Sequence, residues 1–165
     1  MEKPAGSRSS KARMKTVRMG EIVVETDNQP VKTILGSCIG LALFDKHNEV
    51  GGLAHIVLPD SNGHDGPLGK FVDTAIPELI RVIEENKGLR RKLSAKIAGG
   101  ANMLNGSAGS TVGERNYEST KQFLKKLGIP LLASHCGDDY GRRMTFYPGT
   151  GRVCIDIVGC ETIEI

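Results

Sequence analysis

A chain of 165 residues with 39% hydrophobic residues can bury one core of ordinary size, which leaves no room for a second domain of similar size. The formal net charge is only +3, and no Trp, three Tyr and four Phe leave few platforms for stacking bases, so the composition argues against a nucleic-acid-binding protein. No apolar run approaches the ~20 residues that cross a bilayer, and we expect a cytoplasmic protein with no membrane insertion. The four cysteines form no CxxC pair, and in a reducing compartment free thiols are expected.

The N-terminal part of the chain divides into a tail and the start of a domain. Residues 1–16 are rich in Ser, Gly, Lys and Arg without apolar periodicity, which predicts a disordered basic tail. A single domain then covers 17–165. Its first strand is predicted over 21–26 from β-branched content, and the breakers in 27–30 end it.

A β-hairpin is predicted next. Residues 38–44 and 50–58 are apolar without helical periodicity, and the polar segment 45–49 separates them. The following segment, 59–67, is rich in Gly, Pro, Asp and Asn, which is typical of a loop long enough to form the rim of an active site.

Two amphipathic helices and several strands complete the predicted domain. Apolar residues recur at helical spacing over 70–86, although Pro77 must kink that helix or mark a late start. Thr111 and Glu114 have the spacing of a capping box, and the helix they begin ends at Gly128. Further strands are predicted over 93–97, 129–133, 144–147 and 152–158.

The hairpin brings a cysteine and a histidine close together. If the strands pair around a five-residue connection, opposed residue numbers sum to about 94, which places Ile56 opposite Cys38 and His55 within one position of it. That register would put Cys38 and His55 on opposite faces of the sheet. A turn of another length, or a bulge near Gly51 and Gly52, would shift the register by one, and we predict that one of these irregularities is present.

A thiol beside an imidazole suggests nucleophilic catalysis. An imidazolium lowers the pKa of a neighbouring thiol, and the same His55 can protonate a leaving amine and then activate water. Backbone N–H groups around Gly36, Ser37 and Cys38 could face an oxyanion, and Asn102, after the glycines of a tight strand exit, is a candidate substrate contact. The alternative is that Cys38 and His55 are ordinary core residues of apolar strands.

Six segments in the same order resemble one family. They are Leu35-Gly36-Ser37-Cys38, Ala54-His55-Ile56-Val57-Leu58-Pro59-Asp60-Ser61, Lys70-Phe71-Val72-Asp73-Thr74-Ala75-Ile76-Pro77, Lys96-Ile97-Ala98-Gly99-Gly100-Ala101-Asn102-Met103, Gly113-Glu114-Arg115-Asn116 and Gly141-Arg142-Arg143. Together they resemble CheD, the chemoreceptor glutamine deamidase family of bacterial chemotaxis.

This resemblance implies an α/β fold, a layered sandwich of largely antiparallel or mixed β-sheet with two main helices, related to the cysteine hydrolase domain of cytotoxic necrotising factor toxins. It implies that Cys38 is the nucleophile, that His55 is the general base and acid, and that Thr33 orients His55, with Lys32 as the alternative position for that role. No metal or other cofactor is implied.

The implied enzyme is a protein-glutamine glutaminase, a cysteine-dependent amidohydrolase. Its substrates would be glutamines of methyl-accepting chemotaxis receptors, which become glutamates through a thioester, and Arg142 could contact an acidic receptor surface. A CheC-type phosphatase is implied as a further partner. Two other hypotheses fit the sequence: a non-catalytic adaptor that binds CheC, and a cysteine hydrolase or acyltransferase acting on a small molecule.

Overall fold

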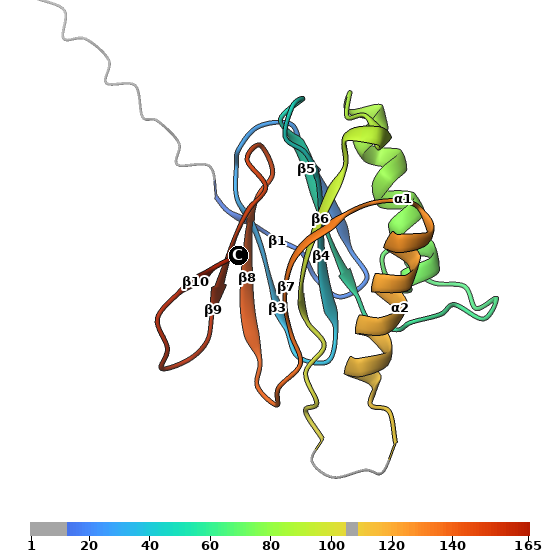
Figure 1. The fold of residues 1–165 in the computed structure, drawn as a ribbon, viewed down its shortest axis with the longest axis vertical. Helices are drawn as coiled ribbons and strands as arrows, with labels where there is room; N and C mark the ends of the chain where they lie inside the picture. Colours follow the sequence, from blue (N-terminus) through green and yellow to red (C-terminus); the bar gives the residue numbers. More distant parts are fainter. Residues whose placement is uncertain (1–12, 105–108) are drawn as a thin grey trace, which may run out of the picture.

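The protein forms three layers in the computed structural model, which describes residues 13–104 and 109–165. Two β-sheets pack face to face, and two helices cover the far side of the second sheet (Figure 1). We call the sheets the outer sheet and the middle sheet. The outer sheet contains, in spatial order, β1 (Lys15–Thr16), β3 (Val31–Leu35), β8 (Arg142–Tyr147), β9 (Arg152–Asp156) and β10 (Ile163–Glu164). The middle sheet contains β2 (Ile22–Glu25), β5 (Val50–Ile56), β4 (Ile39–Asp45), β6 (Ser94–Gly99) and β7 (Leu131–Cys136).

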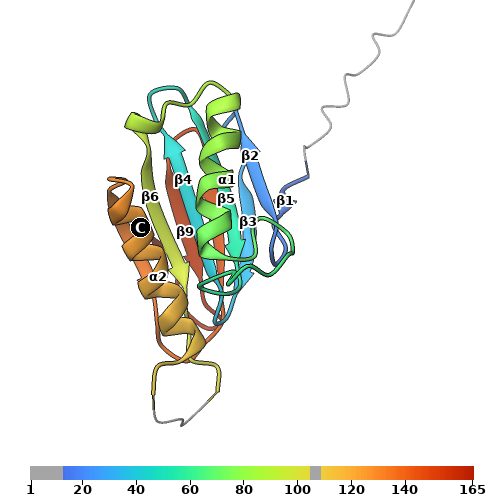
Figure 2. The same cartoon turned by 90° about the vertical axis from the view of Figure 1, so that its right-hand side faces the viewer.

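The helices are α1 (Val72–Glu85) and α2 (Val112–Lys126), with one short 3₁₀ turn, η1 (Arg90–Lys92). Figure 2 shows both helices lying across the middle sheet. The pairs β1–β3 and β6–β7 are parallel and the other neighbouring strands are antiparallel, so both sheets are mixed. The predicted fold class, a layered α/β sandwich with two main helices, is confirmed.

The middle sheet is buried on both faces, which explains why its strands are continuously apolar in sequence. Along β4, Leu41 and Leu43 belong to the core beneath the helices, while Ala42 and Phe44 belong to the core between the two sheets. Because side chains alternate along a strand, one strand supplies both cores. Any residue on the second of these faces therefore points toward the outer sheet.

The β4–β5 hairpin has the odd register that the sequence left undecided. Asp45 pairs with Val50, so the turn has four residues, 46–49, and opposed residue numbers sum to 95. The predicted shift by one is confirmed, and a tighter turn produces it. A bulge at Gly51 and Gly52 was the wrong alternative, because the ladder runs regularly through both. Their missing side chains serve close packing instead: a Cβ at Gly52 would lie 2.6 Å from Leu79 Cδ1 of α1.

Several predicted boundaries change. Residues 1–12 of the predicted tail lie outside the described residues, and Lys15 and Thr16, which the sequence placed in that tail, form β1 against β3. Strand β3 itself was not predicted, because a five-residue segment containing Lys32 and Thr33 shows little apolar pattern. The strand predicted over 152–158 ends at Asp156, after which the chain turns.

Both predicted helices are present. The capping box of Thr111 and Glu114 is confirmed, since each side chain accepts a hydrogen bond from the other's backbone N–H. Helix α1 begins at Val72 and continues through Pro77, so this proline does not mark its start. Within residues 13–104 and 109–165, no helix has the length and apolar character needed to cross a membrane.

Candidate active site

The segment Gly36–Cys38 is where the chain passes from one sheet to the other. It leaves the outer sheet at the end of β3 and enters the middle sheet at the start of β4. Backbone N–H groups from the exit of β6 hold it: Ala101 N donates to Gly36 O at 2.9 Å and Gly100 N donates to Cys38 O at 2.8 Å. Gly99, at φ 108°, has no room for a side chain, because a Cβ there would lie 2.1 Å from Cys38 O. Cys38 is therefore seated on the β6 exit by main-chain contacts.

Thr33 and His55 meet between the sheets. Thr33 lies on β3 and His55 on β5, and Thr33 Oγ1 is 2.7 Å from His55 Nδ1. The same hydroxyl donates to Val17 O at 2.7 Å. Since a hydroxyl has a single proton, Thr33 must accept from His55, and Nδ1 must carry the hydrogen. Nε2 of the neutral ring is consequently the nitrogen free to act as a base.

Cys38 occupies a position diagonal to His55. His55 pairs with Gly40, and Cys38 is two residues before Gly40, which places it on the same face. Diagonal partners across such a ladder lie about 7–8 Å apart, and long side chains span that distance. Both residues are buried, with 8% and 4% exposure. The Cys38 thiol forms no hydrogen bond within the described chain, so the thiol and the imidazole share a face of the sheet without being hydrogen-bonded to each other.

Burial opposes charge on both groups. It raises the pKa of the Cys38 thiol. It lowers the pKa of the His55 imidazole, an effect that the Val17 carbonyl partly offsets. The resting pair is therefore a neutral thiol and a neutral imidazole at neutral pH. This differs from the expectation that an imidazolium lowers the thiol pKa, because desolvation outweighs any such attraction in the buried site.

The raised thiol pKa predicts the pH dependence of Cys38 reactivity. Alkylation of Cys38 by iodoacetamide is expected to be slow at neutral pH and to accelerate as the pH rises beyond the ordinary thiol range, since only the thiolate reacts. Site-resolved peptide mass spectrometry measures this rate, with the exposed Cys160 as the internal reference. Fast alkylation that is already independent of pH near neutrality would contradict a neutral resting pair.

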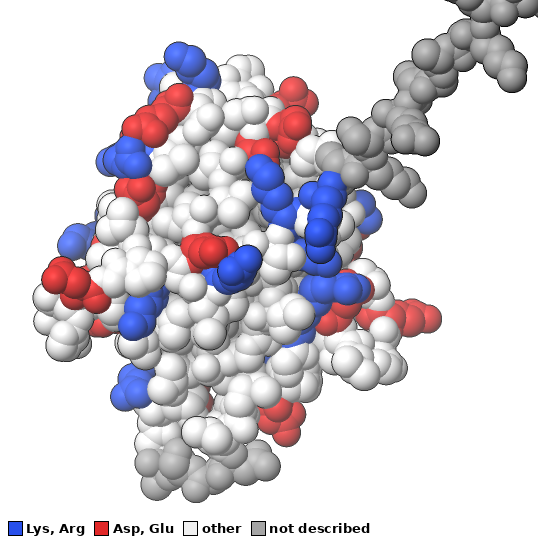
Figure 3. Space-filling model, turned by 180° about the vertical axis from the view of Figure 1, so that it is seen from behind, with Lys and Arg blue, Asp and Glu red and all other residues white. Residues whose placement is uncertain are grey.

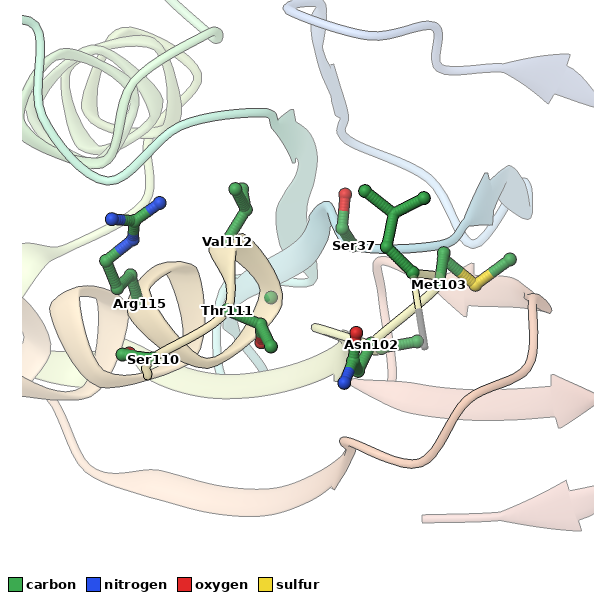
Figure 4. Close-up of a pocket in the computed structure, with 10 residues that line it drawn as sticks. Ser37, Asn102, Met103, Ser110, Thr111, Val112 and Arg115 are labelled. Carbon is green, nitrogen blue, oxygen red and sulfur yellow. The ribbon is translucent and has the colours of Figure 1, made fainter. Parts of the chain in front are cut away.

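A pocket of about 270 Å³ opens beside this segment. Ser37, Asn102 and Met103 lie on one side of it, and the first turn of α2 with Thr111 lies on the other (Figure 4). Gly36 packs against the Met103 side chain. A Cβ atom added to this glycine would lie 3.3 Å from Met103 Cγ. The structure thus brings Gly36, Ser37 and Asn102 to the end of the sandwich where Cys38 is seated.

Arg142 is not presented for docking, contrary to the prediction of a residue that contacts an acidic receptor surface. It is only 2% exposed, and its guanidinium donates to His135 O at 2.7 Å and to Gly137 O. It also lies over the ring of Tyr140. Its donors hold the loop after β7, which in turn accepts a hydrogen bond from Asn102 N through Asp138 O.

Asn116 is a residue of this site to which sequence reasoning gave no role. It lies on α2, is fully buried, and donates to Ser37 O and Val57 O. In the sequence, Asn116 stood out only as a member of one of the six family segments. It is far from Cys38 along the chain, so no local spacing pattern connects the two residues. Within the described chain, no three His, Cys, Asp or Glu side chains gather as metal ligands would.

Charged side chains of both signs are present on the face shown in Figure 3. Acidic and basic residues are interspersed there, and Lys and Arg gather to the right of centre in this view. The face therefore carries both signs of charge beside broad uncharged areas.

Comparison with known proteins finds a family model, curated relatives and a solved structure that are similar to this chain. The family model described as "CheD chemotactic sensory transduction" matches residues 57–157, a range that begins just after His55. A protein of Clostridium botulinum strain Hall named "Probable chemoreceptor glutamine deamidase CheD" is 44% identical, covering 92% of this chain and 99% of the relative. A protein of the same name from Methanococcus maripaludis strain C5 is 40% identical over 84% of this chain and 92% of the relative. Among solved structures, the Bacillus licheniformis hypothetical protein YfiH aligns with a TM-score of 0.46 at 11% identity, over 74% of this chain and 58% of that one.

Proposed function

Because the chain belongs to the CheD family, we propose that it deamidates glutamine side chains of chemoreceptors, with Cys38 as nucleophile and His55 as general base and acid. The names of the curated relatives support the activity and the substrate class. The observation that carries the assignment of residues is the Thr33–His55 hydrogen bond, which commits Nδ1 as a donor and leaves Nε2 as the base on the face that Cys38 shares.

The reaction begins with proton transfer. His55 Nε2 takes the thiol proton as Cys38 Sγ attacks the side-chain carbonyl carbon of the glutamine. Because the thiol and the imidazole are both neutral at rest, His55 acts as a general base during the attack. The imidazolium forms only as the sulfur–carbon bond forms. Thr33 remains the acceptor for Nδ1–H and so holds the ring in the productive tautomer.

The tetrahedral intermediate then collapses. Its oxyanion would be met by the backbone N–H groups of Ser37 and Cys38, which donate to no acceptor in the described chain. His55 returns its proton to the amide nitrogen, which leaves as ammonia with the electrons of the carbon–nitrogen bond, and a thioester to Cys38 remains. Water activated by His55 hydrolyses the thioester. This step releases the receptor, which now carries a glutamate side chain, and restores the free thiol of Cys38.

The substrate side chain would approach along the end of the sandwich. Ser37 and Asn102 border the pocket there, and Gly36 packs against Met103, which also lines it. We propose these residues as the substrate-binding set, with Arg142 supporting the loop beneath Asn102 instead of contacting the receptor.

The proposed function is tested by incubating the protein with a purified cytoplasmic fragment of a receptor from the same organism. Intact-mass analysis is expected to show replacement of an amide NH₂ by OH at discrete glutamines, with stoichiometric ammonia release. The matched control substrate carries Gln→Glu at those positions and should show no change. An unchanged receptor mass after prolonged incubation with every receptor of that organism would overturn the deamidase proposal.

A further inference from the structure

Asn116 bridges the two strands that carry the proposed catalytic pair. Its Nδ2 donates to Ser37 O at 3.0 Å and to Val57 O at 2.9 Å. Ser37 directly precedes Cys38, and Val57 follows His55 by two residues. The β4–β5 ladder ends at the pair Ile39–Ile56, so the Asn116 amide joins the strands just where their own hydrogen bonds stop.

The contact to Ser37 also determines the direction of an N–H group. In a trans peptide, the carbonyl and the N–H of the next residue point in opposite directions. Since Ser37 O is held toward α2, the N–H of Cys38 is directed away from that helix. Adjacent carbonyls, at Gly36 and Cys38, are held by backbone N–H groups, whereas the Ser37 carbonyl is held by a side chain. Asn116 is therefore the side chain whose replacement releases this peptide, together with the carbonyl of Val57.

The orientation of the Asn116 amide leaves one of its own polar atoms without a hydrogen bond. Its Oδ1 is buried and has no hydrogen-bond partner within the described residues. A buried acceptor without a partner is unfavourable for folding. The orientation that leaves Oδ1 unpaired is the one that directs both N–H donors onto the carbonyls of Ser37 and Val57.

We propose that Asn116 is a positioning residue that orients the Ser37–Cys38 peptide so that its N–H group stabilises the oxyanion formed on attack by Cys38. The role rests on the proposed function, in which Cys38 is the nucleophile. It predicts that loss of Asn116 slows steps that pass through an oxyanion and spares a displacement at Cys38 that forms none.

Two small reagents separate these effects without a receptor. Acylation of Cys38 by p-nitrophenyl acetate passes through a tetrahedral oxyanion and releases p-nitrophenolate, whereas alkylation by iodoacetamide does not form an oxyanion. In Asn116→Ala, the acylation rate is expected to fall about 10²-fold while the alkylation rate stays near that of the parent. The matched control is Thr120→Ala, and both rates should be preserved. Thr120 is a buried residue one turn later on α2, and its hydroxyl donates to Asn116 O and to no other acceptor among the described residues.

The isosteric Asn116→Asp provides a second test if the alanine variant does not fold. An ionised carboxylate donates no hydrogen bond and a protonated one donates one, so its acylation rate relative to the parent should rise as the pH falls. Parental acylation in Asn116→Ala, or an equal loss of acylation and alkylation, would overturn the proposal. Failure to modify a receptor would instead bear on the deamidase function, because no receptor enters these measurements.

Discussion

Replacing Cys38 with alanine is expected to abolish deamidation of the receptor fragment, with a loss in kcat of roughly 10⁴-fold or more. In the proposed mechanism Cys38 forms the thioester, so removal of its sulfur leaves only the weak effect of the oxyanion donors. Cys38→Ser is expected to be comparably inactive, because an alcohol is a far weaker acid and the burial-lowered pKa of His55 makes the imidazole a weak base. Release of ammonia under saturating receptor fragment measures both losses.

The control for this variant is Cys154→Ala. Cys154 lies on β9 of the outer sheet and has the same 8% exposure as Cys38, so its removal perturbs a buried site to a similar extent. It should retain parental turnover. Persistent receptor deamidation by purified Cys38→Ala would show that another residue carries the chemistry.

Thr33→Val is expected to lower kcat about 10²-fold with little change in KM, since a general base contributes roughly this much to rate and the valine cannot accept from His55 Nδ1. The methyl group has nearly the shape of the hydroxyl, so packing between the sheets is largely kept. Without the acceptor the imidazole can place its hydrogen on Nε2, where it blocks abstraction of the thiol proton. Steady-state kinetics on the receptor fragment separate kcat from KM.

Two further variants make this prediction specific. Thr33→Ser keeps a hydroxyl that can accept from Nδ1 and donate to Val17 O, and it should recover most of the activity. Thr145→Val replaces another buried threonine of the outer sheet and should leave kcat unchanged. If Thr33→Val turned over as fast as the parent, the tautomer argument would be wrong.

Local patterns in the sequence predicted a large share of the fold. The apolar runs of the hairpin, the helical spacing over 70–86 and the capping box of Thr111 and Glu114 all depend on residues close in the chain. The alternation of side chains along the hairpin strands also made the register decisive, since a shift of one residue moves His55 to the face of Cys38. Strand β3 was missed because its polar residues, among them Thr33, break the apolar pattern.

The sequence by itself determined which groups are available, namely a thiol at Cys38 and an imidazole at His55, which lies on the neighbouring strand of the hairpin. Only the tertiary structure decided how they are held and charged. Thr33 reaches His55 from the other sheet, Asn116 reaches Ser37 across 79 residues of chain, and burial opposes ionisation of both reactive groups. Periodicity records which face of an element is buried, whereas the distance between two faces, the direction of a carbonyl and the local desolvation depend on how separate elements pack.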